Sequence, residues 1–288
     1  MIKFLRQLPL RTVLLIAVIL LALLPRGLFL AETFHKVEFN YLLKGTDQYG
    51  FHNTALHIAN RDDWLLKARR YSQAPFYTYF LAFLYKIFPD DVRTLRVVQS
   101  ILGVGISSLI YLIGLRLFGP AVSFLCAFLY SFYDFSILFE SVLLRATIIG
   151  FLHLGLLFFL IKYLETRKTW LIIISGFILG LDIATRPNAI LLVPFILFIL
   201  WTIPGLHKKK NKLAVCALFL MITVLPSVPF MSRNILLGKP PLDMSQQGLR
   251  VFVAGNMPDS LGFGWNISPQ GQELSKKPMD IPAKFYKE

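Results

Sequence analysis

Long apolar runs alternate with short polar and basic segments along most of the 288-residue chain. About 20 predominantly apolar residues cross the roughly 30 Å hydrocarbon core of a bilayer as a helix. Seven runs are candidates for such spans, and they lie at residues 12–31, 95–117, 119–136, 146–164, 170–185, 188–204 and 213–232. We therefore predict an all-α membrane bundle of about seven spans over residues 1–232, with a polar tail over residues 233–288.

The long segment between the first two runs, residues 32–94, has a different pattern. Residues 76–88, FYTYFLAFLYKIF, are aromatic and amphipathic but too short to span, which predicts a helix lying in the membrane interface. Upstream, a second short helix is expected to begin at Asp47, because apolar residues follow it at helical spacing. These residues are Phe51, Ala55, Ile58 and Ala59.

Basic residues in the short loops predict the orientation of the chain, because cytoplasmic loops are enriched in Lys and Arg. Such residues precede the first run and follow the fourth and the sixth. They are Lys3, Arg6 and Arg11, then Lys162, Arg167 and Lys168, then Lys208, Lys209, Lys210 and Lys212. A multi-pass protein of the plasma (inner) membrane with a cytoplasmic N-terminus fits this pattern. Residues 32–94, a short loop near 137–145 and the tail then lie outside.

Composition narrows the possible partners. The chain is 56% hydrophobic and only 16% charged, whereas soluble domains carry about a quarter charged residues. Its net charge of +14 is spread over helix ends and loops and forms no single stripe, so we expect membrane lipids and no nucleic acid as partners. Cys126 and Cys216 both lie in apolar runs, which indicates packing residues and neither a disulfide nor a metal pair.

Asp47 admits two interpretations. An acidic residue in the first turn of a helix complements the helix dipole, a common structural role. Alternatively, Asp47 is a general base at the membrane face, because a hydroxyl nucleophile needs a base within hydrogen-bond reach.

Several motifs occur in an order that resembles a known family. Asp47 is followed at intervals of four by an aromatic residue and an alanine, then by Asp62-Asp63-Trp64 and by Gln73-Ala74-Pro75-Phe76-Tyr77. This arrangement resembles the first external loop of the dolichyl-phosphate-mannose protein mannosyltransferase and aminoarabinose transferase superfamily. Further similar segments are LIGLRLFGP at 112–120, ILGLDIATRPNAILLVPFILF at 178–198 and Gly255-Asn256-Met257-Pro258.

The resemblance implies a GT-C-like glycosyltransferase fold with a long first external loop containing short interfacial helices. It implies a polyprenyl- or dolichyl-phosphate sugar as donor and a hydroxyl of a protein, lipid or glycan as acceptor. Asp47 would deprotonate this hydroxyl, and the anomeric configuration would invert. One departure is Gln48, where the family often carries Glu, which weakens the case for two carboxylates at this point.

The leaving lipid phosphate needs cationic partners, and arginine suits this role because its fork matches phosphate oxygens. The candidates on the predicted outer side are Arg186, Arg145, Arg69, Arg70 and Lys67. Arg186 is favoured because it ends a membrane span, although a salt bridge with Asp182 is the structural alternative.

Glu140 matches an acidic position that faces the catalytic cavity in the family, where it would orient the acceptor or a metal. A solvated or Arg-paired carboxylate is the alternative, and Asp134 competes for the same role. The sequence indicates no cofactor, and a divalent metal, although compatible with the resemblance, has no ligand motif. His52 and His57 are five residues apart, which does not suit two zinc ligands on one helix face.

Two other classes of protein stay open. Asp182, Arg186 and Arg145 would suit the path of a transporter or lipid flippase, but no inverted repeat is visible. A non-catalytic membrane subunit of the same fold fits Gln48 and the length of the chain. Related enzymes usually have more spans, so we expect either a fragment of a longer enzyme or a chain that needs a partner.

Overall fold

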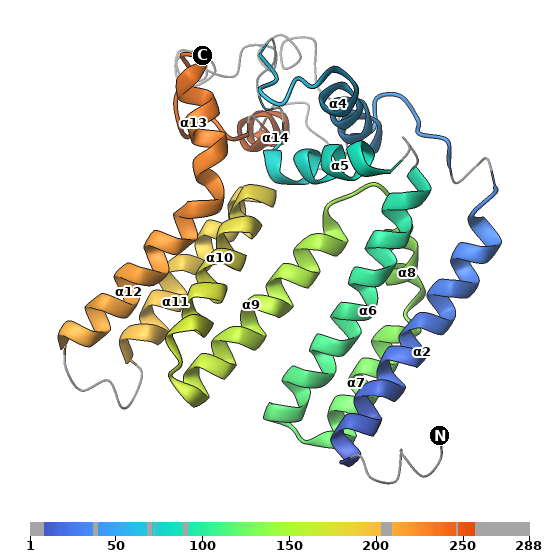
Figure 1. Cartoon of the computed structure of the whole chain (residues 1–288), viewed down its shortest axis with the longest axis vertical. Helices are drawn as coiled ribbons and strands as arrows, with labels where there is room; N and C mark the ends of the chain where they lie inside the picture. Colours follow the sequence, from blue (N-terminus) through green and yellow to red (C-terminus); the bar gives the residue numbers. More distant parts are fainter. Residues whose placement is uncertain are drawn as a thin grey trace. The chain divides into compact units, whose positions relative to one another are not determined.

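The computed structural model of the chain describes residues 9–36, 40–67, 71, 73–88, 92–202, 209–245 and 247–256. All regular elements in these ranges are helices, as the apolar pattern predicts (Figure 1). In chain order they are α2 (Leu10–Thr33), α4 (Asp47–Arg61), α5 (Pro75–Ile87), α6 (Val92–Leu117), α7 (Pro120–Ser131), α8 (Asp134–Ser141), α9 (Ala146–Thr166), α10 (Thr169–Thr185), η1 (Pro187–Leu191), α11 (Leu192–Thr202), α12 (Lys209–Val224), η2 (Leu225–Ser227), α13 (Val228–Leu236) and α14 (Gln247–Asn256).

Each predicted apolar run contains helix in its described residues, but the helices differ in length, and the third run is broken at Phe132 and Tyr133. Within the described ranges, four helices are long and apolar enough to cross a membrane: Leu10–Thr33, Val92–Leu117, Ala146–Thr166 and Asn211–Leu236. The pair α7 and α8, bent by 52°, makes a fifth candidate, while α10 and the segment Pro187–Thr202 are apolar but shorter. The chain is therefore a multi-helix integral membrane protein.

The prediction of a short external loop near residues 137–145 is wrong for the first half of that range. Helix α8 covers Asp134–Ser141, and only Phe132 and Tyr133 separate it from α7. The apolar residues that follow Asp134 continue the helical pattern past the expected end of the third run.

The described residues divide into two compact units. One lies within Met1–Leu65 and Phe76–Val228, and the other within Leu66–Pro75 and Pro229–Glu288. The first unit holds the helices from α2 to α12, and its core has two parts. Leu156, Leu179, Phe219 and their neighbours pack α9, α10, α11 and α12 together, while Val18, Tyr111 and Ala127 join α2, α6 and α7.

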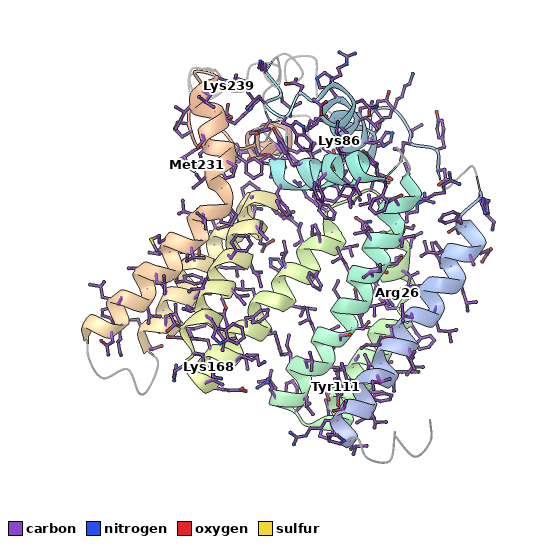
Figure 2. All side chains as sticks on the ribbon, viewed as in Figure 1. Arg26, Lys86, Tyr111, Lys168, Met231 and Lys239 are labelled. Carbon is purple, nitrogen blue, oxygen red and sulfur yellow. The ribbon has the colours of Figure 1, made fainter. Side chains whose placement is uncertain are left out.

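Polar contacts fix the helices on the α2 side of the first unit. The hydroxyl of Tyr111 on α6 donates to the backbone oxygen of Arg11 on α2 at 2.9 Å. Arg26, on the same helix α2, is only 1% exposed. Figure 2 labels Arg26 and Tyr111 on α2 and α6, which lie side by side.

The two short helices predicted in the first long loop are both present. Helix α4 begins at Asp47 and buries Phe51, Ala55, Ile58 and Ala59, the four residues expected from their spacing. Helix α5 packs against it, because Phe51 meets Tyr77 edge to face with ring centroids 4.9 Å apart and His52 Nδ1 lies 3.0 Å from the hydroxyl of Tyr85. The location of α5 in the membrane interface stays a prediction.

Gly180 on α10 allows the close approach of the chain at the end of α12. A Cβ atom at this position would lie 2.3 Å from the backbone oxygen of Thr223 and 2.7 Å from the ring of Pro226. We expect Gly180→Ala to lower the free energy of unfolding by about 1–3 kcal/mol, because these backbones would have to separate. Thermal unfolding of the purified protein in detergent measures the effect.

The matched control is Gly27→Ala on α2, where a Cβ atom would meet nothing within 4 Å. This variant should unfold at the same temperature as the wild type or slightly above it, because alanine is the better helix former. Equal stability of the two variants would contradict the close packing of α10.

Candidate active site

Asp47 stands at the start of α4 and faces solvent. The side chain of Thr46, the N-cap residue, accepts a hydrogen bond from the backbone N–H of Tyr49 at 3.4 Å, so Asp47 itself is not the cap. Its carboxylate is exposed and lies in the first helical turn, where a negative charge complements the dipole. This position leaves the carboxylate accessible to a substrate.

Arg145 precedes α9 and reaches both α4 and α10. Its guanidinium lies 5.9 Å from the ring centroid of Phe51, which is one turn after Asp47, and its Nη1 donates to the backbone oxygen of Thr185 at 3.3 Å. A cation at the N-terminus of a helix is unfavourable for the dipole, so this arginine needs negative charge nearby.

Electrostatic interactions join Arg145, Asp47 and Arg186. Burial lowers the pKa of the Arg145 guanidinium, the positive charge of Arg186 lowers it further, and the carboxylate of Asp47 opposes both effects. The structure therefore brings together three of the residues predicted from the sequence. The two arginines offer charge-assisted donors to an anionic ligand.

Pro187 determines how Arg186 leaves helix α10. A residue before proline is disfavoured in the helical conformation, and Arg186 is extended with φ −145° and ψ 104°. The helix thus ends at Thr185, and the side chain of Arg186 is exposed. Asn188 follows in the 3-10 helix η1 and is also exposed.

A cavity of about 550 Å³ opens beside Arg186, between α9 and the segment η1–α11. Three of its lining residues are polar, namely His153, Arg186 and Asn188. The other nine are apolar: Leu156, Leu157, Leu160, Ala189, Leu191, Leu192, Phe195, Ile196 and Ile199. The cavity therefore suits an amphiphile with a polar head and a hydrocarbon tail.

Asp182, the expected alternative partner of Arg186, forms its ion pair with a different residue. Its Oδ2 lies 2.7 Å from Nε2 of His153 on α9, and the aspartate is fully buried. The charge of Arg186 also acts on this carboxylate. His153 was not among the residues predicted from the sequence.

Glu140 is buried in a different part of the first unit. Arg26 donates from Nε to its Oε2 at 2.8 Å and from Nη2 to its Oε1 at 2.7 Å, a bidentate pair between α2 and α8. Glu140 is therefore paired with an arginine, which was the alternative interpretation. Its role at the acceptor or a metal stays a prediction. Asp134 lies exposed in the first turn of α8.

The segment that leads from Glu140 to Arg145 is held by two polar residues of α6. Gln99 Nε2 donates to the backbone oxygens of Glu140 and Val142 at 2.6 and 2.9 Å, and Arg96 Nε donates to that of Ser141 at 2.9 Å. These bonds fix the chain just before Arg145. Sequence reasoning missed both residues, although a charge and an amide early in an apolar helix are an available signal.

The other three cationic candidates are Lys67, Arg69 and Arg70. Lys67 is exposed and belongs to the second unit. Arg69 and Arg70 lie outside the described residues. Among the residues that the structure describes, no group of three or more His, Cys, Asp or Glu side chains could hold a metal ion. His57 Nε2 instead lies 3.2 Å from Asp63 Oδ2.

Sequence comparison identifies a family. The family model described as dolichyl-phosphate-mannose-protein mannosyltransferase matches residues 72–230, more than half of the chain. No curated protein matches the chain in sequence. The matched region includes Glu140, Arg145 and Arg186, while Asp47 precedes it.

Comparison with solved structures identifies the fold. The chain is similar to the oligosaccharyltransferase of Archaeoglobus fulgidus in the apo form, with 15% identity and a TM-score of 0.59 over 94% of this chain and 36% of that one. It is also similar to AglB from the same organism in complex with an inhibitory peptide and a dolichol-phosphate, with 14% identity and a TM-score of 0.55 over 96% of this chain and 36% of that one. The chain thus spans little more than a third of these proteins.

Proposed function

Because the chain belongs to the dolichyl-phosphate-mannose-protein mannosyltransferase family, we propose that it transfers a sugar from a polyprenyl- or dolichyl-phosphate donor to an acceptor hydroxyl. The observation that carries this proposal is the cluster of Asp47, Arg145 and Arg186 beside an apolar cavity. A carboxylate, two cations and a hydrocarbon-lined space are the groups that such a reaction requires.

Asp47 is the general base of the proposed reaction. Its exposed carboxylate takes the proton of the acceptor hydroxyl, whose oxygen forms the new bond to the anomeric carbon of the sugar. The bond between this carbon and the phosphate oxygen breaks on the opposite face, and the electron pair leaves with the lipid phosphate. The anomeric configuration is inverted because attack and departure occur on opposite faces.

Arg186 and Arg145 bind the phosphate and stabilise the charge that develops as it leaves. Arginine keeps its charge when partly buried and offers two parallel donors to phosphate oxygens. Arg145 is half-buried between α4 and α10, where the lower effective dielectric strengthens its interaction with an anion. Its contact is with Phe51, which follows the base by one helical turn.

The apolar cavity receives the first part of the isoprenoid tail. Arg186 and Asn188 line the same cavity as the nine apolar residues, so a bound lipid phosphate would place its head at these side chains and its tail along α9 and α11. The AglB structure, which holds a dolichol-phosphate and a peptide, supports this class of donor and a protein acceptor. Lipid and glycan acceptors, and an active site on the outer face of the plasma membrane, belong to the same proposal.

The donor side of this proposal is tested with Arg186→Ala. We expect kcat/KM for sugar transfer to fall about 10- to 150-fold, because hydrogen bonds to charged groups contribute about 1.5–3 kcal/mol. The assay supplies the purified protein in lipid with radiolabelled polyprenyl-phosphate sugars and a membrane extract as acceptor.

Arg61→Ala provides the control, because Arg61 is an exposed arginine in the last turn of α4. Its transfer rate should equal that of the wild type. Unchanged kinetics in Arg186→Ala would contradict the role of Arg186 in phosphate binding. Movement of a lipid-linked sugar without a glycosidic product would favour a flippase.

A further inference from the structure

His153 lies on the wall between two cavities of the first unit. It lines the cavity of about 550 Å³ that contains Arg186, and it also lines a smaller one of about 350 Å³ between α6, α8 and α9. The imidazole is 45% exposed, although it is in the middle of a membrane-spanning helix. A polar side chain at such a position needs a partner or a ligand.

Asp182 supplies the partner of His153. Its Oδ2 lies 2.7 Å from His153 Nε2, an ion-pair contact between α10 and α9. The carboxylate is fully buried, and among the described residues neither of its oxygens has a partner in hydrogen-bond geometry. A carboxylate removed from water is strongly unfavourable without a partner, so the contact with Asp182 holds the imidazole at this place in the cavity wall.

The contact with Asp182 leaves one imidazole nitrogen for a ligand. Within the described part of the chain no hydrogen bond reaches Nδ1 of His153, since the contact to Asp182 uses Nε2. Nδ1 therefore remains for a polar group bound in the cavity, while the buried carboxylate holds the ring.

Arg186 shares both the cavity and the carboxylate with His153. The two side chains line the same space, and both act electrostatically on Asp182. Asn188 is the third polar residue of this lining. The polar residues of an otherwise apolar cavity are therefore an arginine, an imidazole and an amide, each of which can donate a hydrogen bond to an anion.

We propose that His153, held by Asp182, is a second phosphate-binding residue, which acts with Arg186 on the phosphate of the lipid carrier. This inference rests on the proposed function, because it assigns the residue to the donor site of that reaction. Asp182 is a positioning residue, which orients the imidazole. The shared chemistry is a phosphate on a hydrocarbon chain, and the polyprenyl phosphate is the favoured source because nine apolar residues continue from the polar group.

The test measures binding of decaprenyl phosphate and of decaprenol, its uncharged alcohol, to the purified full chain in nanodiscs. His153→Gln should weaken decaprenyl phosphate about tenfold, which corresponds to the lower part of the range for a charged hydrogen bond. Decaprenol should bind with unchanged affinity, because the apolar lining stays intact. Phosphatidylglycerol serves as a competitor that carries an ordinary phospholipid phosphate.

His57→Gln is the matched control, because it removes the histidine of the other His–Asp pair, on α4. It should not change the affinity for either probe. Asp182→Asn should reproduce the selective loss of decaprenyl phosphate, and the double variant His153→Gln/Asp182→Asn should be no weaker than His153→Gln alone. Thermal unfolding of each variant establishes that it is folded.

The outcomes separate this inference from the proposed function. A loss with Arg186→Ala but none with His153→Gln would overturn the role of His153 and leave the donor site standing. No loss with either variant would remove the donor site and the proposed function together. An equal loss of phosphatidylglycerol and decaprenyl phosphate in His153→Gln would overturn the assignment to the donor and indicate a general lipid site.

Discussion

Replacement of Asp47 by asparagine is expected to lower the rate of sugar transfer by about 10²- to 10⁴-fold, the usual contribution of a general base. Asparagine keeps the shape of the side chain and tolerates the first turn of α4, but it cannot take the proton of an acceptor hydroxyl. The affinity for decaprenyl phosphate should change little, because Arg145 and Arg186 stay in place. Single-turnover transfer in lipid, with equal amounts of folded protein, measures this effect.

The control for this experiment is Asp62→Asn at the other end of the same helix. Asp62 is exposed, pairs with Lys86 at 2.7 Å, and has a left-handed backbone at φ 51° that asparagine adopts readily. This variant should transfer sugar at the wild-type rate. Full activity in Asp47→Asn would instead return Asp47 to its structural role at the helix dipole and move the base elsewhere.

The second large effect is expected at the buried pair of Arg26 and Glu140, and it concerns stability. Glu140→Gln leaves the Arg26 guanidinium without its charged partner at 1% exposure. Loss of one member of a buried pair lowers the free energy of unfolding by about 3–5 kcal/mol, because the other charge stays desolvated. Unfolding of the purified protein by denaturant titration in micelles measures the loss.

A double replacement separates the structural and the functional roles of Glu140. Arg26→Met/Glu140→Leu should recover most of the lost stability, because apolar residues of similar volume replace a buried pair at little net change. If the double variant is stable and transfers sugar, Glu140 has only a structural role in the helix bundle. Wild-type stability in Glu140→Gln together with loss of transfer would contradict the stability prediction and support its predicted place in the reaction.

The sequence predicted the local features of the candidate site well. The apolar spacing after Asp47 identified α4 and its buried face, and the apolar run at residues 170–185 ends at the same residue as α10. The motif order indicated the family that the comparison then identified. These predictions succeed because the hydrophobic period acts over neighbouring residues.

The sequence predicted the contacts of the charged residues less well. Asp182 and Arg186 are four residues apart, which suggested a salt bridge between them. Asp182 instead pairs with His153 on another helix. Glu140 pairs with Arg26, which is 114 positions away in the chain. Arg26 and His153 both interrupt apolar runs. An ionisable residue inside a membrane segment indicates a paired or functional side chain, and this signal is present at both positions as it is at Arg186.

The sequence by itself determined the helical membrane architecture, helix α4 with its buried face, and the end of α10 before Arg186. Each of these follows from hydrophobic period, helix length and backbone sterics, which are properties of short segments. Only the tertiary structure decided which buried charges pair, which residues share the apolar cavity, and that Arg145 contacts both α4 and α10. Those relations depend on helix packing, which places side chains from distant segments together and which no local pattern encodes.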